Sequence, residues 1–218
     1  MSHIVLGAPL QGEWRFVRPP GHHPDAFDFV RYDADRRALH RSSRWRNYLG
    51  SIPSSEFFAW GEPVLAPIDG RVIRVGSDWP DHESTSIWAT IGIWYNATFR
   101  FRPQAVQGRI DIRPNAGNFV MLESEQGYIV FLAHLMRGSI LVTEGRTVEC
   151  GEVIARVGDS GNSTMPHLHV NVFDQMDDPL AAQVLPCTFE AYRTLRADGV
   201  WREATRSLPS RGDFVRFE

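Results

Sequence analysis

Three histidine-bearing segments of the sequence contain side chains that bind zinc or transfer protons. In the run His-Leu-His-Val-Asn-Val, one residue separates His167 from His169. Alternate residues of a β-strand point to the same face, so we expect these imidazoles on one side, about 6.6 Å apart at ~3.3 Å per residue. His134 closes a second apolar run, Phe-Leu-Ala-His-Leu. Taken alone, the His-x-His run is equally explained by two surface histidines, and His134 is better explained by a hydrogen-bonded histidine at the edge of the core.

The third segment places two histidines shortly before an aspartate. His22 and His23 precede Pro24, and Asp28 stands between two phenylalanines in a predicted strand. A carboxylate in a half-buried strand needs a metal ion or another cation as its partner. This segment therefore indicates a metal site, to which either histidine could contribute.

Together the segments supply the ligands of a catalytic zinc site. One of His22 and His23, with Asp28 and His169, gives three ligands and leaves the fourth coordination position open, which is typical of catalytic zinc. Zinc in such a site lowers the pKa of its bound water towards 7 and polarises a peptide carbonyl. The other two segments each keep one further imidazole to shuttle protons or stabilise the oxyanion. The sequence has no His-Glu-x-x-His helix, which excludes a thermolysin-like site.

Short apolar runs separated by turn residues predict an all-β fold that positions these segments. Residues 117–122 and 128–135 are two such runs, and the Glu-Ser-Glu-Gln-Gly between them is a strong hairpin signal. Further strands are expected at residues 27–32, 71–75 and 167–173, and a strand pair at 147–157. Residues 179–184 favour a short helix. We therefore expect two packed antiparallel sheets in a sandwich-like arrangement.

One domain is expected to include the whole chain, residues 1–218. Its core extends over about residues 21–175, and no linker precedes the C-terminal extension at about 178–218. A long insertion at about residues 76–116 interrupts the core, and it is rich in aromatic residues, with Trp88, Trp94, Tyr95 and Phe99 close together. Disordered segments are poor in such side chains. We expect the insertion to form a satellite core, or alternatively a wall of a substrate groove or a subunit contact.

The composition excludes several classes of function. All 23 basic residues are arginine, and the absence of lysine excludes a Walker A loop, a Schiff-base enzyme and a lysine-linked cofactor. The net charge of -3 argues against a nucleic-acid partner. Cys150 and Cys187 belong to no Cys-x-x-Cys pair, so we expect two buried free thiols rather than a cysteine zinc site.

No stretch of the sequence has the pattern of a signal peptide or of a transmembrane helix. We therefore expect no membrane span, and a cytoplasmic chain unless a leader has been removed. The compartment and the oligomeric state stay open.

Six short sequence motifs follow one another along about residues 21–175. They are a His…Asp motif ending in Ala-Phe-Asp-Phe, then Gly-Glu-Pro-Val-Leu-Ala-Pro-Ile-Asp-Gly-Arg-Val, Gly-Asn-Phe-Val, Phe-Leu-Ala-His-Leu, Val-Glu-Cys-Gly-Glu-Val-Ile-Ala-Arg-Val-Gly and Gly-Asn-Ser-Thr-Met-Pro-His-Leu-His-Val. In this order they resemble the lysostaphin/LytM-type zinc metallopeptidases, a family of peptidoglycan endopeptidases. Each motif alone is weak evidence for this resemblance, but the six motifs in this order are specific. The resemblance implies zinc as the cofactor and the duplicated hybrid motif fold, a barrel-sandwich hybrid.

The resemblance also implies a role for each residue of the site. Asp28 and His169 would be zinc ligands, and His134 and His167 would be the catalytic histidines beside the zinc-bound water. Ser163 would lie on the loop that borders the site. The substrate would be a cross-bridge or stem peptide of the bacterial cell wall, held in a groove over a β-sheet. The expected activity is that of a metalloendopeptidase, a hydrolase.

The first ligand departs from the spacing of this family. The family places a histidine four residues before the aspartate, where this sequence has Pro24, which cannot bind a metal. The ligand would then be His23 or His22, five or six residues before Asp28, on a longer loop. The sequence does not distinguish these two histidines.

Three other interpretations of the sequence are alternatives to a peptidase. Pro-Ile-Asp-Gly-Arg-Val and Val-Glu-Cys-Gly-Glu-Val-Ile also resemble biotinyl and lipoyl carrier domains, but the chain has no lysine to carry the cofactor. A cupin-type metal enzyme also uses His-x-His, usually with a glutamate shortly after it, whereas Val-Asn-Val-Phe follows here. The third alternative is a catalytically silent LytM-like binding or regulatory protein.

Overall fold

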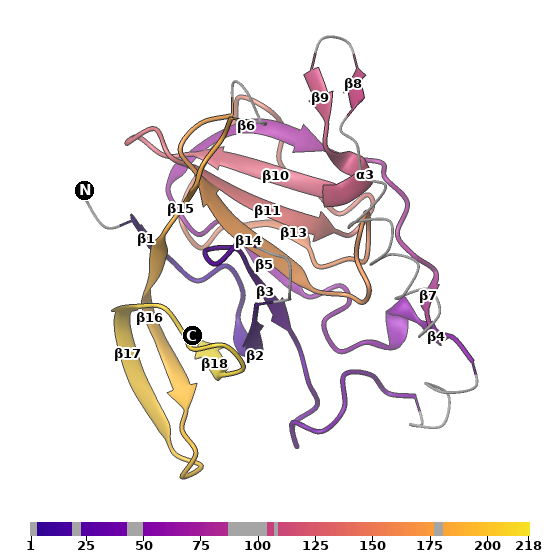
Figure 1. Ribbon diagram of the computed structural model, residues 1–218, viewed down its shortest axis with the longest axis vertical. Coiled ribbons are helices and arrows are strands. Elements are labelled where there is room, and N and C mark those ends of the chain that lie inside the picture. Colours follow the sequence, from indigo (N-terminus) through magenta and orange to yellow (C-terminus); the bar gives the residue numbers. More distant parts are fainter. Residues whose placement is uncertain (1–3, 19–22, 43–49, 87–103, 107–108, 177–180) are drawn as a thin grey trace.

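A single large sheet dominates the computed structural model, which describes residues 4–18, 23–42, 50–86, 104–106, 109–176 and 181–218 (Figure 1). Within these residues the sheet contains twelve strands. Ten of them lie in the order β1 (Ile4–Leu6), β16 (Cys187–Leu195), β18 (Phe214–Phe217), β2 (Gly12–Val17), β3 (Phe27–Val30), β14 (Leu168–Phe173), β11 (Ile129–Leu135), β10 (Asn118–Glu123), β6 (Gly70–Gly76) and β12 (Thr147–Val148). β15 (Val184–Leu185) pairs with β14, and β17 (Trp201–Ser207) pairs with β16. The described pairs are antiparallel apart from β1 and β16, which run parallel.

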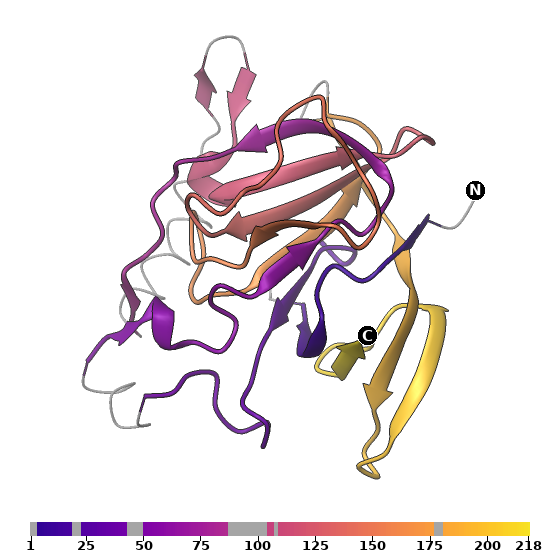
Figure 2. The same cartoon turned by 180° about the vertical axis from the view of Figure 1, so that it is seen from behind.

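A two-stranded ribbon forms a second layer over this sheet. β5 (Pro63–Leu65) and β13 (Val153–Arg156) pair with each other and lie across the sheet on the side that faces the viewer in Figure 2. Val64 and Ile154 of the ribbon share one buried core cluster with Val120, Leu132 and Val170 of the sheet. The predicted all-β fold is therefore confirmed, with layers of unequal size.

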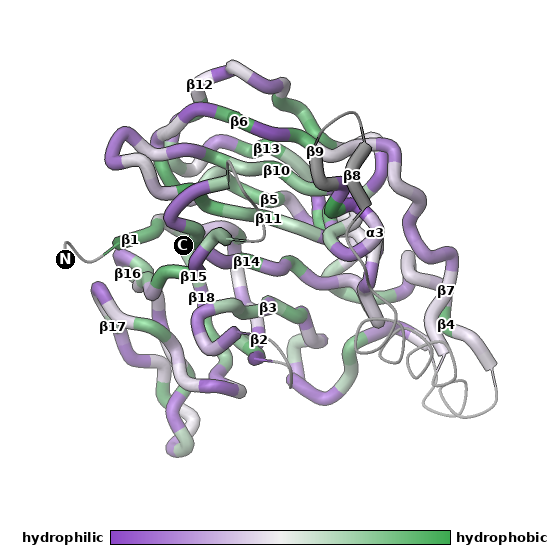
Figure 3. Tube along the Cα trace, turned by 45° about the horizontal axis from the view of Figure 1, so that its top comes forward, coloured by the Kyte–Doolittle hydropathy of each residue, from purple (hydrophilic) through white to green (hydrophobic). Residues whose placement is uncertain are grey.

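The central strands β10 and β11 are mostly apolar because both of their faces are covered. All seven residues of β11 are buried. Val130 and Leu132 point into the large core beneath the ribbon, whereas Phe131 and Ala133 belong to a smaller cluster on the opposite face. Figure 3 shows this as green along most of β10 and β11. Such strands read as unbroken apolar runs rather than as alternating ones, and this explains why the hairpin at residues 117–135 is so clear in the sequence.

The C-terminal extension joins the same sheet as the N-terminal strands. β18 pairs with β2, and β16 pairs with β1. Phe16, Phe29, Phe189 and Phe217 pack edge to face, with neighbouring ring centroids 5.5 to 5.8 Å apart. These contacts attach the extension to β3, one of the strands of the site. They support the single-domain organisation of residues 1–218, which stays a prediction.

Two expected elements differ in the structure. The strands at residues 147–157 do not pair with each other, because the turn at Gly151 leads the chain from the sheet into the ribbon: β12 pairs with β6, and β13 pairs with β5. The expected helix at residues 179–184 is wrong at its end, where Val184 begins β15. Residues 177–180 lie outside the described part.

The insertion at about residues 76–116 is described only at its two ends. There, β7 (Ser84–Thr85) pairs with β4 (Ile52–Pro53). β8 (Gln104–Val106) pairs with β9 (Arg109–Asp111), and α3 (Arg113–Ala116) leads into β10. Trp88, Trp94, Tyr95 and Phe99 lie outside the described residues, so the role of the insertion stays a prediction. None of the helices in the described residues is long and apolar enough to cross a membrane.

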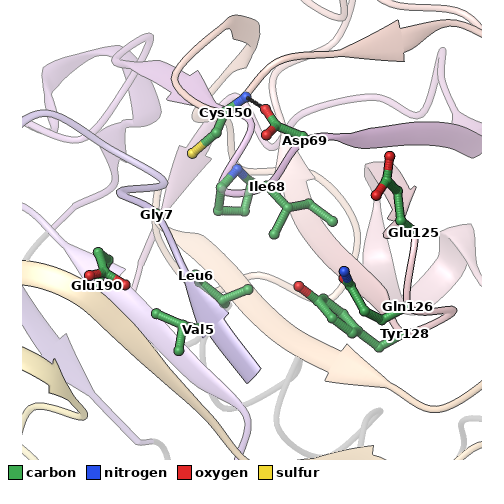
Figure 4. A pocket seen from close by; sticks show the side chains of 11 residues that line it. Val5, Leu6, Gly7, Ile68, Asp69, Glu125, Gln126, Tyr128, Cys150 and Glu190 are labelled. Carbon is green, nitrogen blue, oxygen red and sulfur yellow. Dashed lines mark hydrogen bonds between the residues drawn. The ribbon is translucent and has the colours of Figure 1, made fainter. Parts of the chain in front are cut away.

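Both cysteines are free, but only one is buried. Cys187 at the start of β16 is buried, as expected, whereas Cys150 is exposed. The expected burial of Cys150 is wrong because the residue lies in the turn between β12 and β13, at the surface. There it borders a hollow of about 420 Å³ that Asp69, Tyr128 and Glu190 also line (Figure 4).

The two thiols should differ sharply in reactivity. Burial raises the pKa of Cys187 to about 12, and a thiol without thiolate character does not react. Partial burial and then Asp69 also raise the pKa of Cys150, so we expect slow but measurable alkylation of Cys150 in the native protein and of Cys187 only after unfolding. Iodoacetamide labelling followed by peptide mass spectrometry measures both, with Cys150→Ser as the control. Labelling of Cys187 first, or a disulfide between the two, would contradict this structure.

Candidate active site

Three neighbouring strands of the large sheet bring the predicted site residues together. In the antiparallel pair of β3 and β14, Asp28 lies directly opposite His169. Their side chains share a face of the sheet, and His169 Nδ1 is 2.8 Å from Asp28 Oδ1. His167, which immediately precedes β14, places Nε2 3.6 Å from Asp28 Oδ2. The prediction that His167 and His169 lie on the same side is therefore confirmed, since both side chains face one carboxylate.

His134 reaches this cluster because β11 contains a β-bulge. Asn118 lies opposite Leu135 and Val120 opposite Leu132, so two residues of β11 face one residue of β10. His134 has a φ of 61°, in the left-handed region, which costs a residue other than glycine on the order of 1–3 kcal/mol. Bulges of this kind redirect side chains next to functional sites. The His134 ring lies 4.6 Å from the ring of His167, centroid to centroid.

The surroundings of His134 keep its imidazole neutral. Its Nδ1–H donates a 2.8 Å hydrogen bond to the carbonyl of Ser160, which leaves the lone pair on Nε2. Burial, together with the imidazoles of His167 and His169, lowers the pKa of His134 well below its ordinary value of 6.5. Gly117 permits this packing, because a Cβ at that position would lie 2.4 Å from the Ser160 carbonyl oxygen.

Hydrogen bonds also determine which nitrogens of the other two rings carry a proton. Nδ1 of His167 donates to the carbonyl of Met165 at 2.7 Å, which leaves Nε2 as the ring's acceptor. Nε2 of His169 is 3.0 Å from Asn171 Oδ1, an atom that can only accept, so this nitrogen carries the proton. In its neutral form, His169 therefore turns the lone pair of Nδ1 towards Asp28 Oδ1.

This pair of acceptors fits a metal ion. Two lone pairs at 2.8 Å require a proton or a cation between them, and the side chain of Asp28 is only 6% exposed, which removes the compensation of water. An imidazole nitrogen and a carboxylate oxygen are both ordinary zinc ligands. Asp28 and His169 are thus the described residues whose donor atoms suit a metal. Within the described residues, no group of three or more His, Cys, Asp or Glu is arranged to hold one.

The predicted first ligand is not part of this arrangement. His22 lies outside the described residues. His23 is about half exposed, and its Nδ1 accepts a 3.2 Å hydrogen bond from the backbone of Asp25. The structure therefore brings together Asp28, His167 and His169 with His134, but it does not place a third ligand beside them.

Several polar residues of the site were not predicted from the sequence. Asn171 Oδ1 accepts a hydrogen bond from His169, and the carbonyl of Ser160 accepts one from His134. Asp159 is fully buried and is linked to His167 through Ser163, a residue that the family resemblance had already placed beside the site. The available signal was the run Gly-Asp-Ser-Gly-Asn-Ser-Thr before the His-x-His motif, because its short polar side chains favour turns that hydrogen-bond their neighbours.

Residues 105–180 match the sequence pattern of peptidase family M23. The M23 region includes His134, His167 and His169, whereas Asp28 precedes it.

Two curated proteins are each similar to about half of this chain. The peptidoglycan DD-endopeptidase ShyB of Vibrio cholerae is 32% identical over 106 residues, which cover 49% of this chain and 22% of that protein. An uncharacterized metalloprotease of Haemophilus influenzae is 33% identical over 109 residues, which cover 50% of this chain and 15% of that protein. The chain thus spans less than a quarter of either relative.

Solved structures of peptidases are also similar to this chain. A putative peptidase M23 from Pseudomonas aeruginosa is 22% identical with a TM-score of 0.42, covering 78% of this chain and 45% of that one. The catalytic domain of lysostaphin from Staphylococcus simulans is 17% identical with a TM-score of 0.41, covering 83% of this chain and 88% of that one.

The depressed pKa of His134 predicts a pH dependence of folding. The unfolded chain takes up a proton at His134 below about pH 6.5, whereas the zinc-free folded protein does so only at lower pH. The contribution of neutral His134 to the free energy of unfolding is fully present above pH 6.5. It is lost as the pH falls from 6.5 through the folded pKa, by about 1.4 kcal/mol for each unit of depression.

Denaturant unfolding at a series of pH values, with His134→Asn for comparison, measures this loss. Asparagine tolerates a positive φ and does not titrate, so the variant should lose less stability between about pH 7 and pH 5. Parallel losses in the two proteins would show that the pKa of His134 is not depressed.

Proposed function

We propose that this chain is a zinc-dependent metalloendopeptidase that hydrolyses peptide bonds of bacterial peptidoglycan, in cross-links or stem peptides. The observation that carries the proposal is the contact of Asp28 with His169 across β3 and β14, beside two further buried imidazoles. The M23 match supports a metallopeptidase. The similarity to a peptidoglycan DD-endopeptidase supports the substrate class.

In this proposal Asp28 and His169 hold the zinc, with His22 or His23 as the third ligand. Zinc supplies Lewis-acid chemistry: it polarises the scissile carbonyl and lowers the pKa of its bound water. Asn171 keeps the proton of His169 on Nε2 and so directs Nδ1 to the metal. Hydrogen bonds of this kind commonly orient metal-bound histidines.

His134 and His167 carry the proton transfers. Each ring donates Nδ1–H to a backbone carbonyl, so each presents Nε2 to a proton. Because their centroids are 4.6 Å apart, the two rings disfavour simultaneous protonation. Either ring can take up the proton of the attacking water, and the depressed pKa of His134 suits delivery of a proton to the leaving amine.

One observation favours a second candidate, a catalytically silent LytM-like binding or regulatory protein. Among the described residues, the two proposed ligands Asp28 and His169 lie together, but no group of three or more His, Cys, Asp or Glu is arranged to hold a metal. Metal content and turnover of the purified protein distinguish this candidate from the enzyme.

Substitutions should separate the ligands from the proton carriers. We expect about one zinc per chain by elemental analysis. His169→Ala and Asp28→Ala should lose zinc and activity together, whereas His134→Ala and His167→Ala should keep zinc and lose turnover by roughly 10²-fold or more. Activity is measured from the soluble fragments that purified peptidoglycan releases. Full activity of His134→Ala, or a protein that takes up no zinc, would remove the basis of these roles.

A matched pair of variants identifies the first ligand. His22→Ala and His23→Ala differ by one position on the same loop, and a single coordination place is available to them. We expect one variant to lose zinc affinity by at least about 10-fold and the other to bind as the unmodified chain does. Competition against a chelator measures both affinities. Equal, small losses would mean that neither histidine is the ligand.

A further inference from the structure

The carboxylate of Asp159 is fully buried at the back of the histidine cluster, between two serine hydroxyls. Its Oδ1 accepts a 2.7 Å hydrogen bond from Ser163, and its Oδ2 accepts one of 2.8 Å from Ser54. Ser54 belongs to the 3-10 turn η1 (Ser54–Glu56), which is far from Ser163 in sequence. The proposed function so far assigns no task to this carboxylate, although a buried charge is costly unless its hydrogen bonds are satisfied.

Hydrogen bonds hold the backbone of Asp159 on both sides. Its N–H donates to Asp81 Oδ1 at 2.8 Å, and its carbonyl accepts from the backbone N–H of His82 at 3.0 Å. Asp81 also accepts from the backbone N–H of Arg137. The first part of the insertion, at Asp81 and His82, therefore holds the backbone of Asp159 in place against the site.

The direction of the hydrogen bonds from Asp159 to His167 follows from counting protons. The hydroxyl of Ser163 has one proton and three neighbours: Asp159 Oδ1 at 2.7 Å, the Met165 carbonyl at 2.8 Å and His167 Nδ1 at 3.2 Å. A carboxylate is the strongest of these acceptors, so the hydroxyl of Ser163 donates its hydrogen bond to Asp159. The oxygen of Ser163 then turns a lone pair towards Nδ1 of His167, which must carry a proton to donate to Met165.

We propose that Asp159 and Ser163 are positioning residues that hold the His167 ring with its proton on Nδ1 and its Nε2 lone pair facing the reaction site. Asp159 orients the hydroxyl of Ser163, and Ser163 with the Met165 carbonyl forms a two-acceptor clamp on Nδ1–H. The inference rests on the proposed function in one respect only, namely that His167 acts on the substrate. The tautomer of His167 itself does not depend on that function.

The first test reads the tautomer directly. Long-range ¹⁵N–¹H spectra of the zinc-loaded protein distinguish the two neutral forms of each imidazole. We expect the Nδ1–H form for His167, and Ser163→Ala should weaken this preference so that the Nε2–H form becomes detectable. A His167 ring found as Nε2–H in the unmodified protein would overturn the inference, whether or not the protein hydrolyses peptidoglycan.

The second test asks whether Asp159 acts through Ser163. Ser163→Ala and Asp159→Ala should each lower kcat roughly 10-fold to 100-fold, the scale of losses from outer hydrogen bonds that orient an imidazole, with KM and zinc content unchanged. The double variant should be no slower than Ser163→Ala alone, because coupled residues are not additive. Asp159→Asn still offers an oxygen to Ser163 and should recover most of kcat. Should Asp159→Ala not fold, Asp159→Asn and Ser163→Ala still test the clamp.

Ser139→Ala provides the matched control. Its hydroxyl also donates to a backbone carbonyl, that of Met136, and we expect unchanged kcat and an unchanged His167 tautomer. Additive losses in the double variant, or a Ser163→Ala protein with full kcat and the original tautomer, would overturn the inference. If the unmodified protein has no peptidase activity, the proposed function fails, and the tautomer spectra still test the clamp.

Discussion

The register between β3 and β14 places Asp28 opposite His169, and the other parts of the site are arranged around that contact. Side chains alternate along a strand, so a slip of one residue would turn Asp28 into the core and leave a phenylalanine beside the imidazole. Phe27 and Phe29, on either side of Asp28, are fully buried on the other face. Their burial stabilises the correct register by about 1.5–3 kcal/mol per side chain. The phenylalanines thus determine which face the carboxylate occupies.

Hydrogen bonds from rigid strands and tight turns offset the free-energy penalty of burying the polar side chains of the site. Asp28, His134, His167 and Asp159 are all buried, and an unsatisfied polar group at any of them would cost about 1–3 kcal/mol. His134 adds the strain of its positive φ. Backbone carbonyls of Ser160 and Met165 take up the ring protons, so main-chain atoms, which do not rotate away, fix the tautomers. The result is a polar cluster whose proton positions are set by the fold itself, as the proposed catalysis requires.

Local patterns predicted much of this architecture. The apolar runs at residues 117–135 gave the central hairpin, and the spacing of His167 and His169 gave their common face. The bulge at His134 was not predictable, because it depends on how β10 and β11 match in register. The hydrogen bonds of Asp159 join residues as distant as Ser54, which no local pattern connects. The separate pairing of the two strands at residues 147–157 was not predictable from the sequence, because a turn does not reveal which layer the next strand joins.

The central claim is that Asp28 and His169 are two ligands of one zinc ion. Anomalous diffraction from crystals of the zinc-loaded protein, recorded on both sides of the zinc absorption edge, tests it most directly. The claim predicts one strong peak about 2.0–2.2 Å from His169 Nδ1 and from a carboxylate oxygen of Asp28, with His22 or His23 as the third ligand. A crystal that contains zinc but shows no peak between these two side chains, or a peak held by other residues, would contradict it.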